Sequence, residues 1–299
     1  TNGKTLDFPI TKNGAGTLQL QDNLTMGSTR TFTLTAGTLD LTGNSGNWTL
    51  STGLFNTNNS NVRAITFGTG NITLTGNNAR LYDQSTSTNF SYTGSGIINW
   101  TYSGSVGTRS AVVQSSTTEA QALNHNISAG SDTFQFYYVF KTLDLTGFTG
   151  TYAMQANVVC YGGVKFPAAA TVTFSTFSYS FSATSGSYTI TTGNNKTFNA
   201  VTFGGSGTST ATWALQDNLT TASTSTTTGA LQVAGGAGIT GNLNVGSLAN
   251  PGSAHTFLGN VGIGTVAPTV PLHISKDGGS LSAFIDLYAS TSGGAAWIG

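Results

Sequence analysis

Apolar residues alternate with threonine, serine and asparagine along most of the chain. A period of two is typical of strands that bury one face. Glycine and asparagine interrupt the alternation every few residues, and both tolerate the positive φ that tight corners require. The pattern therefore predicts short strands joined by sharp corners. The clearest examples are residues 31–35, 38–42, 47–50, 64–67 and 71–75.

One passage occurs twice. Asn2-Gly-Lys-Thr-Leu leads to Leu18-Gln-Leu-Gln-Asp-Asn-Leu-Thr25, and Asn194-Asn-Lys-Thr-Phe leads to Trp213-Ala-Leu-Gln-Asp-Asn-Leu-Thr220. A shorter string, Thr-Leu-Asp-Leu-Thr-Gly, is found at 38–43 and again at 142–147. Such repeats favour a modular β-solenoid over a compact enzyme, with a β-sandwich as the main alternative. Because the strands before Asn194 have no counterpart before Asn2, we expect an internal piece of a longer polypeptide.

Composition narrows the class of protein. Of 299 residues, 7% are charged and 37% are hydrophobic, and the net charge is zero. Disorder usually combines low hydrophobicity with high net charge, so this chain should fold. It has no basic stripe for nucleic acid and no apolar run long enough to span a membrane. The single cysteine, Cys160, is expected to be a small buried hydrophobe.

The pattern divides the chain into four segments. Residues 1–105 are predicted to form solenoid repeats. Residues 106–190 are less regular and rich in aromatic residues, with a helical turn predicted within 116–125. Residues 191–222 hold the second copy of the repeated passage, and residues 223–299 form a Gly/Thr-rich stalk that is truncated.

Two strings near the end of the chain resemble a known family. Gly229–Val245 alternates small and apolar residues, and Asn260-Val-Gly-Ile-Gly-Thr-Val-Ala-Pro268 precedes Pro271-Leu-His-Ile274. Both are similar to the distal stalk of bacteriophage tail fibres and related virion appendages, of the kind that precedes an intramolecular-chaperone domain. The resemblance implies an all-β protein in which β-solenoid repeats lead into a trimeric stalk. It also implies an extracellular place in the virion, with other virion proteins as partners.

A trimer is also compatible with elementary packing. A narrow stalk buries little apolar surface within one chain, so it gains from association with further copies.

Glycoside hydrolysis is the main enzymatic alternative, because it usually needs two carboxyl groups about 5–10 Å apart. Glu119 is the only glutamate, and Asp132 is its candidate partner. Aspartates that recur with the repeats are more simply explained as corner residues. We therefore expect no catalytic residues, with Glu119 and Asp132 as the alternative. The three histidines share no ligand spacing, so neither a metal nor a cofactor is expected.

Exposed aromatic rings among polar side chains are a common means of binding sugars. Trp100, Tyr137 and Tyr138 are the candidates for glycan contact, and a place in the solenoid core is the alternative for each. The leading hypothesis is a non-enzymatic component of a phage tail fibre or virion appendage, an elongated scaffold that supports attachment to the host cell, with a host-surface glycan as a candidate partner. A polysaccharide-depolymerising tailspike and a bacterial surface adhesin or filament subunit are the alternatives.

Overall fold

The computed structural model describes residues 1–193, 196–204 and 209–217, together with the backbone of four further strands. Two compact units are distinguished, Thr1–Ala237 and Gly238–Gly299. In the second unit, β30 (Val261–Ile263) pairs in parallel with β31 (Leu272–Ile274). Apart from these two strands and β29 (Leu231–Val233), the stalk predicted at 223–299 lies outside the described residues.

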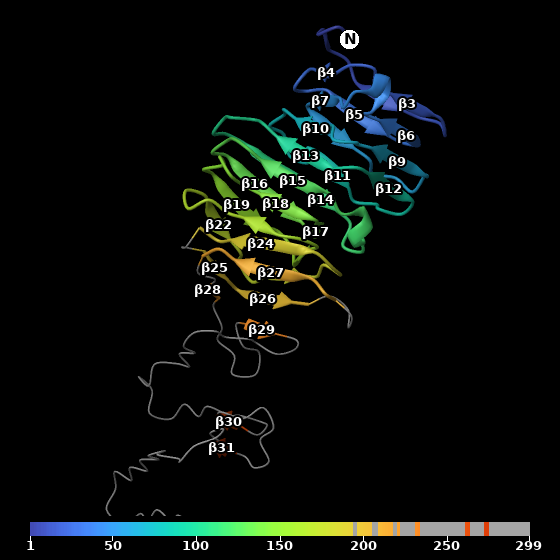
Figure 1. Ribbon diagram of the computed structural model, residues 1–299. Helices are drawn as coiled ribbons and strands as arrows, with labels where there is room; N and C mark the ends of the chain where they lie inside the picture. The colour runs from blue at the N-terminus through green and yellow to red at the C-terminus, as the bar shows by residue number, and fades with distance from the viewer. Residues whose placement is uncertain are drawn as a thin grey trace, which may run out of the picture. The chain divides into compact units, whose positions relative to one another are not determined.

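The first unit is built from three faces, over which the chain runs in a fixed order (Figure 1). One passage over the three faces is called a coil, and the bend between two faces is called a corner. Face 1 is a single sheet in the described part of the chain. Its strands are β1 (Thr5–Leu6), β4 (Leu24–Met26), β7 (Thr49–Thr52), β10 (Asn71–Leu74), β13 (Ile97–Trp100), β15 (Asn124–Ile127), β18 (Thr142–Asp144), β21 (Val164–Lys165), β24 (Ser187–Thr191) and β27 (Thr212–Leu215).

Face 2 follows face 1 in each coil and consists of one long sheet and one short sheet. The long sheet contains β2 (Ile10–Lys12), β5 (Thr31–Leu34), β8 (Leu54–Asn56), β11 (Tyr82–Gln84), β14 (Thr108–Val113), β16 (Thr133–Tyr137), β19 (Thr151–Met154) and β22 (Thr171–Thr173). The short sheet contains β25 (Thr197–Phe198) and β28 (Thr220–Thr221).

Face 3 completes each coil and is divided into two sheets. The first contains β3 (Thr17–Gln19), β6 (Gly37–Asp40), β9 (Arg63–Thr66) and β12 (Phe90–Thr93). The second contains β17 (Val139–Phe140), β20 (Val158–Cys160), β23 (Ser178–Phe181), β26 (Ala200–Phe203) and β29. Two short 3-10 helices, η1 (Gly43–Ser45) and η2 (Glu119–Gln121), lie in connections.

Each strand of face 1 pairs in parallel with the equivalent strand of the next coil. The described strands therefore form a parallel β-solenoid of about nine turns, which confirms the predicted all-β solenoid. Successive coils are separated by the usual interstrand spacing of about 4.8 Å. Faces 1 and 2 run through residue 106 without interruption, so the aromatic-rich segment predicted as irregular belongs to the same solenoid.

The interruption of face 3 coincides with one long connection. Between β14 and β15 the chain makes no strand on face 3, and residues 114–123 form a loop that contains η2. Thr118 and Gln121 form a capping box at η2, each side chain bonding to the other's backbone. The helical turn predicted within 116–125 is confirmed, although it covers only the three residues of η2.

The repeated passage occupies different faces in its two copies. In the first copy Thr5 pairs with Thr25 on face 1, and in the second Thr197 pairs with Thr220 on face 2. The Thr-Leu-Asp-Leu-Thr-Gly string likewise forms β6 on face 3 and β18 on face 1. For both strings, the second copy lies on the face that follows the face of the first copy along the chain. The longer passage spans about one coil, because its first and last strands are ladder partners, and its second copy begins one face later than the first.

The aspartate of the repeated passage bonds to backbone nitrogen atoms of the preceding coil in both copies. Asp22 accepts hydrogen bonds from the terminal amine of Thr1 and from the Asn2 amide. Asp217 accepts them from the amides of Thr192 and Gly193, one coil earlier in the chain. This aspartate ties a corner to the preceding coil, as expected for a structural residue.

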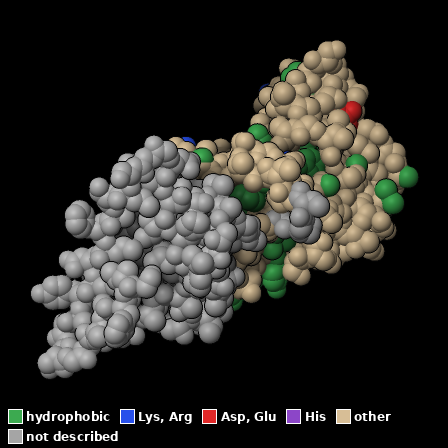
Figure 2. All heavy atoms as spheres, turned by 60° about the horizontal axis from the view of Figure 1, so that its bottom comes forward, with side chains coloured by type: hydrophobic (Ala, Val, Ile, Leu, Met, Phe, Trp, Pro, Cys, Tyr) green, Lys and Arg blue, Asp and Glu red, His purple; other side chains and the backbone are tan. Residues whose placement is uncertain are grey.

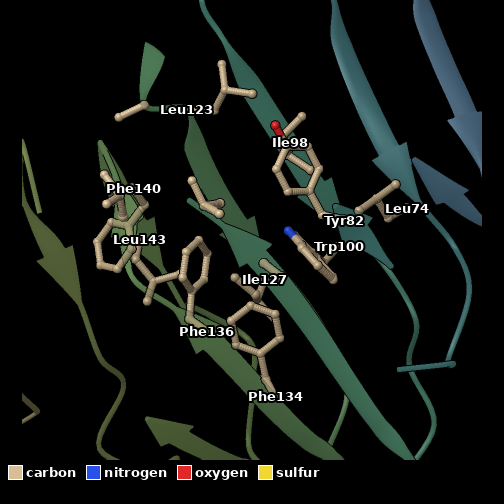
Figure 3. Close-up of a cluster of buried hydrophobic side chains, with 14 of the residues drawn as sticks. Leu74, Tyr82, Ile98, Trp100, Leu123, Ile127, Phe134, Phe136, Phe140 and Leu143 are labelled. Carbon is tan, nitrogen blue, oxygen red and sulfur yellow. The ribbon is translucent and has the colours of Figure 1, made fainter. Parts of the chain in front are cut away.

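The core consists of the inward-pointing residues of all three faces, stacked coil upon coil. On face 2 the rings of Phe32, Phe55 and Tyr82 stack in succession, with centroids 5.9 and 6.1 Å apart. Figure 3 shows Trp100 of face 1 and Phe134 of face 2 among the side chains that fill this interior. Burying one such side chain stabilises a fold by about 2–3 kcal/mol, and the stack repeats that contribution in each coil.

Charged residues serve mainly to hold corners and coils. Each carboxylate in the described part of the chain bonds to a backbone amide, a hydroxyl or an arginine, and the set is Asp7, Asp22, Asp40, Asp83, Glu119, Asp132, Asp144 and Asp217. The described surface seen in Figure 2 is accordingly dominated by uncharged polar side chains and backbone, with scattered hydrophobic groups.

Arg63 is a fully buried cation that holds two corner loops together. Its Nε atom donates to the carbonyl oxygen of Thr57 at 2.8 Å, and Nη1 donates to those of Asn61 and Thr88 at 3.0 and 2.7 Å. Nη2 donates to the carbonyl oxygen of Thr86. Carbonyl dipoles thus take the place of a counter-ion, and the hydrogen bonds hold the loop before β9 and the loop before β12 next to each other.

We expect Arg63→Met to lower the free energy of unfolding by about 3 kcal/mol or more, because several carbonyl groups lose a charged donor. Arg80→Met is the matched control, since Arg80 is exposed and makes only a 3.5 Å ion pair with Asp83. Urea unfolding followed by circular dichroism measures both variants. Equal losses in the two variants would contradict this role of Arg63.

His125 is a neutral base within the aromatic core. Its Nδ1 atom accepts a hydrogen bond from Trp100 Nε1 at 3.2 Å, and the rings of Tyr82 and Phe136 contact it edge-on. Burial lowers the pKa of His125 to about 3, from 6.5. Below pH 6.5 the unfolded chain binds a proton at His125, whereas the folded chain binds it only near pH 3. The contribution of His125 to the free energy of unfolding is therefore fully present above pH 6.5 and decreases as the pH falls toward 3.

We expect His125→Gln to remove this dependence, because an amide oxygen still accepts from Trp100 but does not titrate. Between pH 6 and pH 4 the wild-type free energy of unfolding should lose about 1.4 kcal/mol per pH unit more than that of the variant. Urea unfolding at several pH values measures the difference. Parallel pH profiles for the two proteins would refute the assignment.

Candidate functional site

The loop that interrupts face 3 borders a hollow of about 750 Å³. Its lining comes from β12, from the loop itself, and from four connections that lie farther along the chain. We call this hollow the η2 groove. The lining residues that carry its chemistry are Tyr92, Thr117, Glu119, Lys141, Tyr161 and Thr184.

Hydrogen bonds fix the walls of the η2 groove. Glu119 Oε2 accepts from the amide and the hydroxyl of Thr184 at 2.9 and 2.8 Å, across 65 positions of sequence. Tyr161 donates its hydroxyl proton to the carbonyl oxygen of Thr117 at 3.3 Å. Tyr92 donates to that of Ala122 at 2.9 Å. The loop is therefore tied to coils on both sides, and its position is set without a ligand.

The tyrosines of the η2 groove remain protonated donors. Burial raises the pKa of both Tyr92 and Tyr161, and the nearby negative charge of Glu119 raises each further. Lys141 supplies the positive charge of the lining. Its Nζ atom has no hydrogen-bond or ion partner within the described ranges, although its backbone is held by Leu123 and Cys160. Nothing in the sequence pattern singles out Lys141.

The structure assigns Glu119 and Asp132 to different environments. Asp132 is buried and forms a two-point ion pair with Arg109, at 2.8 Å from Nε and 2.7 Å from Nη2. It does not line the η2 groove, whose single carboxylate is Glu119. A second described hollow, on face 1, also has one carboxylate, Asp144, which faces Lys165 at 3.7 Å. Neither of these two hollows presents the paired carboxylates that glycoside hydrolysis needs.

The three glycan-contact candidates divide into one core residue and two surface residues. Trp100 is fully buried and donates to His125, so its assignment as a surface contact is wrong. It shares the inward side of β13 with Ile98. Tyr137 is the last residue of β16 and Tyr138 follows it, with ring centroids 6.4 Å apart, and Tyr138 is 38% exposed. Their role in glycan contact stays a prediction.

Cys160 is fully buried and free, as expected. Burial raises the pKa of its thiol, and Sγ donates to the carbonyl oxygen of Lys141 at 3.3 Å. A thiol in this environment is unreactive.

Among the residues that the structure describes, no three histidine, cysteine, aspartate or glutamate side chains gather into a metal site. No helix in this described part is long and apolar enough to cross a membrane.

We expect Asp132→Asn to destabilise the fold by about 3–5 kcal/mol, because it leaves Arg109 as an unpaired buried cation. Asp7→Asn is the control, since Asp7 pairs with Arg30 on the surface and its loss should change stability little. Urea unfolding compares the two. A stable Asp132→Asn protein that had lost an activity on polysaccharide would instead indicate a catalytic role.

Comparisons with protein families, with curated proteins and with solved structures find no match to this chain.

Proposed function

We propose that this chain is a structural component of a phage tail fibre or similar virion appendage, and that it acts as a homotrimeric scaffold in host-cell attachment without catalysis. One observation carries the proposal: each carboxylate in the described ranges is engaged in holding a corner, a loop or a neighbouring coil. Carboxylates placed in this way contribute to rigidity, and neither of the two described hollows has the carboxylate pair that glycoside hydrolysis needs.

The way in which the sequence repeats also supports a scaffold. One sequence passage serves on two different faces, so the sides of the coil are interchangeable building units. A chain built from interchangeable sides can be lengthened without a new core, since each coil contacts only its neighbours. The distal strings Gly229–Val245 and Asn260–Pro268 add the resemblance to fibre stalks, on which the trimer and the virion location rest.

Light scattering of the intact purified protein should give about three chain masses. The trimeric stalk joins three copies in this proposal, so a stable monomer at micromolar concentration would contradict it.

Immunogold labelling then tests the location of the protein. Antibodies raised against the purified chain should label the appendages of virus particles that are prepared from the sample in which the gene is found. Label confined to bacterial surfaces would instead favour an adhesin or filament subunit.

Sugar release separates the scaffold from a depolymerising tailspike. Incubation of the protein with the surface polysaccharide of bacterial cells to which it binds should release no reducing ends. Release that is lost in Glu119→Gln would overturn the non-enzymatic assignment.

A further inference from the structure

We propose that the η2 groove is a binding site for an uncharged oligosaccharide. The inference goes beyond the scaffold role and does not rest on it, because the groove is defined by its own lining. It also differs from the surface tyrosines at 137 and 138, which do not line this hollow.

The size of the hollow suits such a ligand. Its volume of about 750 Å³ lies within the range of ligand sites, which is about 300–1,000 Å³. The hollow lies beside the loop that takes the place of a strand on face 3, and its lining includes exposed residues of that loop.

The lining offers the groups that sugar hydroxyls need. Ser115 and Ser116 contribute exposed hydroxyl groups, each of which both donates and accepts, whereas the hydroxyl groups of Thr117 and Thr118 are engaged with Ser87 and Gln121. Lys141 offers the three donors of an ammonium group that has no other partner in the described ranges. Glu119 accepts from Thr184 through Oε2, and its second oxygen, Oε1, makes no hydrogen bond within the described ranges.

Charge balance selects an uncharged ligand. The lining holds one carboxylate, Glu119, and one ammonium group, Lys141. An acidic polymer would gain from Lys141 but would be repelled by Glu119, which is fixed in place by Thr184. Hydroxyl groups of a neutral sugar can use both charges, since they donate to a carboxylate and accept from an ammonium group.

Rigidity of the walls reduces the entropic cost of binding. Tyr92 and Tyr161 are held through their hydroxyl groups, and both are partly buried aromatic residues. Gln121 Nε2 further fixes the loop by donating to the carbonyl oxygens of Ser87 and Phe90 at 2.9 and 3.0 Å. A site that is ordered before the ligand arrives loses little conformational freedom on binding.

The test is a binding measurement on the intact chain. The probes are the neutral tetrasaccharides cellotetraose, maltotetraose, laminaritetraose, mannotetraose and chitotetraose, together with acidic tetragalacturonate. Saturation-transfer NMR identifies any binder, and isothermal calorimetry measures its Kd. We expect at least one neutral probe to bind, and tetragalacturonate to bind more weakly or not at all.

Lys141→Met should weaken that binding about tenfold, because the ammonium donor is lost while the fold keeps its contacts. Lys165→Met is the matched control, since it removes a cation of the same kind from face 1 and should leave Kd unchanged. Thermal unfolding verifies that both variants are folded. Glu119→Gln, whose amide oxygen still accepts from Thr184, should also weaken binding.

Three results would overturn the proposal: no neutral probe binds at about 10 mM, only tetragalacturonate binds, or Lys141→Met and Lys165→Met bind equally well. None of them would bear on the chain mass or on the location of the protein, so failure of this inference is distinguishable from failure of the scaffold role.

Discussion

The parallel backbone ladder between coils is the constraint on which the rest of this structure depends. It places each residue about 4.8 Å from its counterpart in the next coil, so side chains of one kind must tolerate their own repetition. Inward positions meet this demand with stacked rings, as in Phe32, Phe55 and Tyr82. Polar groups on the outside hydrogen-bond along the same ladder, as Thr142 does with Asn124 at 2.7 Å.

Corners are where the ladder alone is insufficient, and the charged residues gather there. Backbone groups in a corner have no strand partner, so a carboxylate or a guanidinium group supplies one. Arg63 does this with four carbonyl groups, and Asp22 and Asp217 do it with the amides of an adjacent coil. A chain with few charged residues thus uses those in the described part almost entirely for structure.

Local pattern predicted the strands well because alternation is a property of neighbouring residues. The stretches predicted at 31–35 and 71–75 correspond to β5 and β10. The same alternation indicates that Trp100 points inward, because Trp100 lies on the same side of its strand as the apolar residue Ile98. The face on which a strand lies could not be read in this way, since it depends on how many corners precede it. The repeated passage shows this directly, because similar sequences lie on faces 1 and 2.

The η2 groove could not be predicted from the sequence for the same reason. Its residues come from separate coils, and only the register of the ladder brings Glu119 to Thr184. Coil length gives no signal either, because the step from Ile97 to its partner Asn124 is about as long as the preceding step from Asn71 to Ile97. Faces 1 and 2 stay continuous through this coil, and the loop with η2 takes the place of a strand on face 3. A solenoid can therefore acquire a recess at one corner while its core remains intact, because the ladders on the other two faces still carry the stacking of the coils.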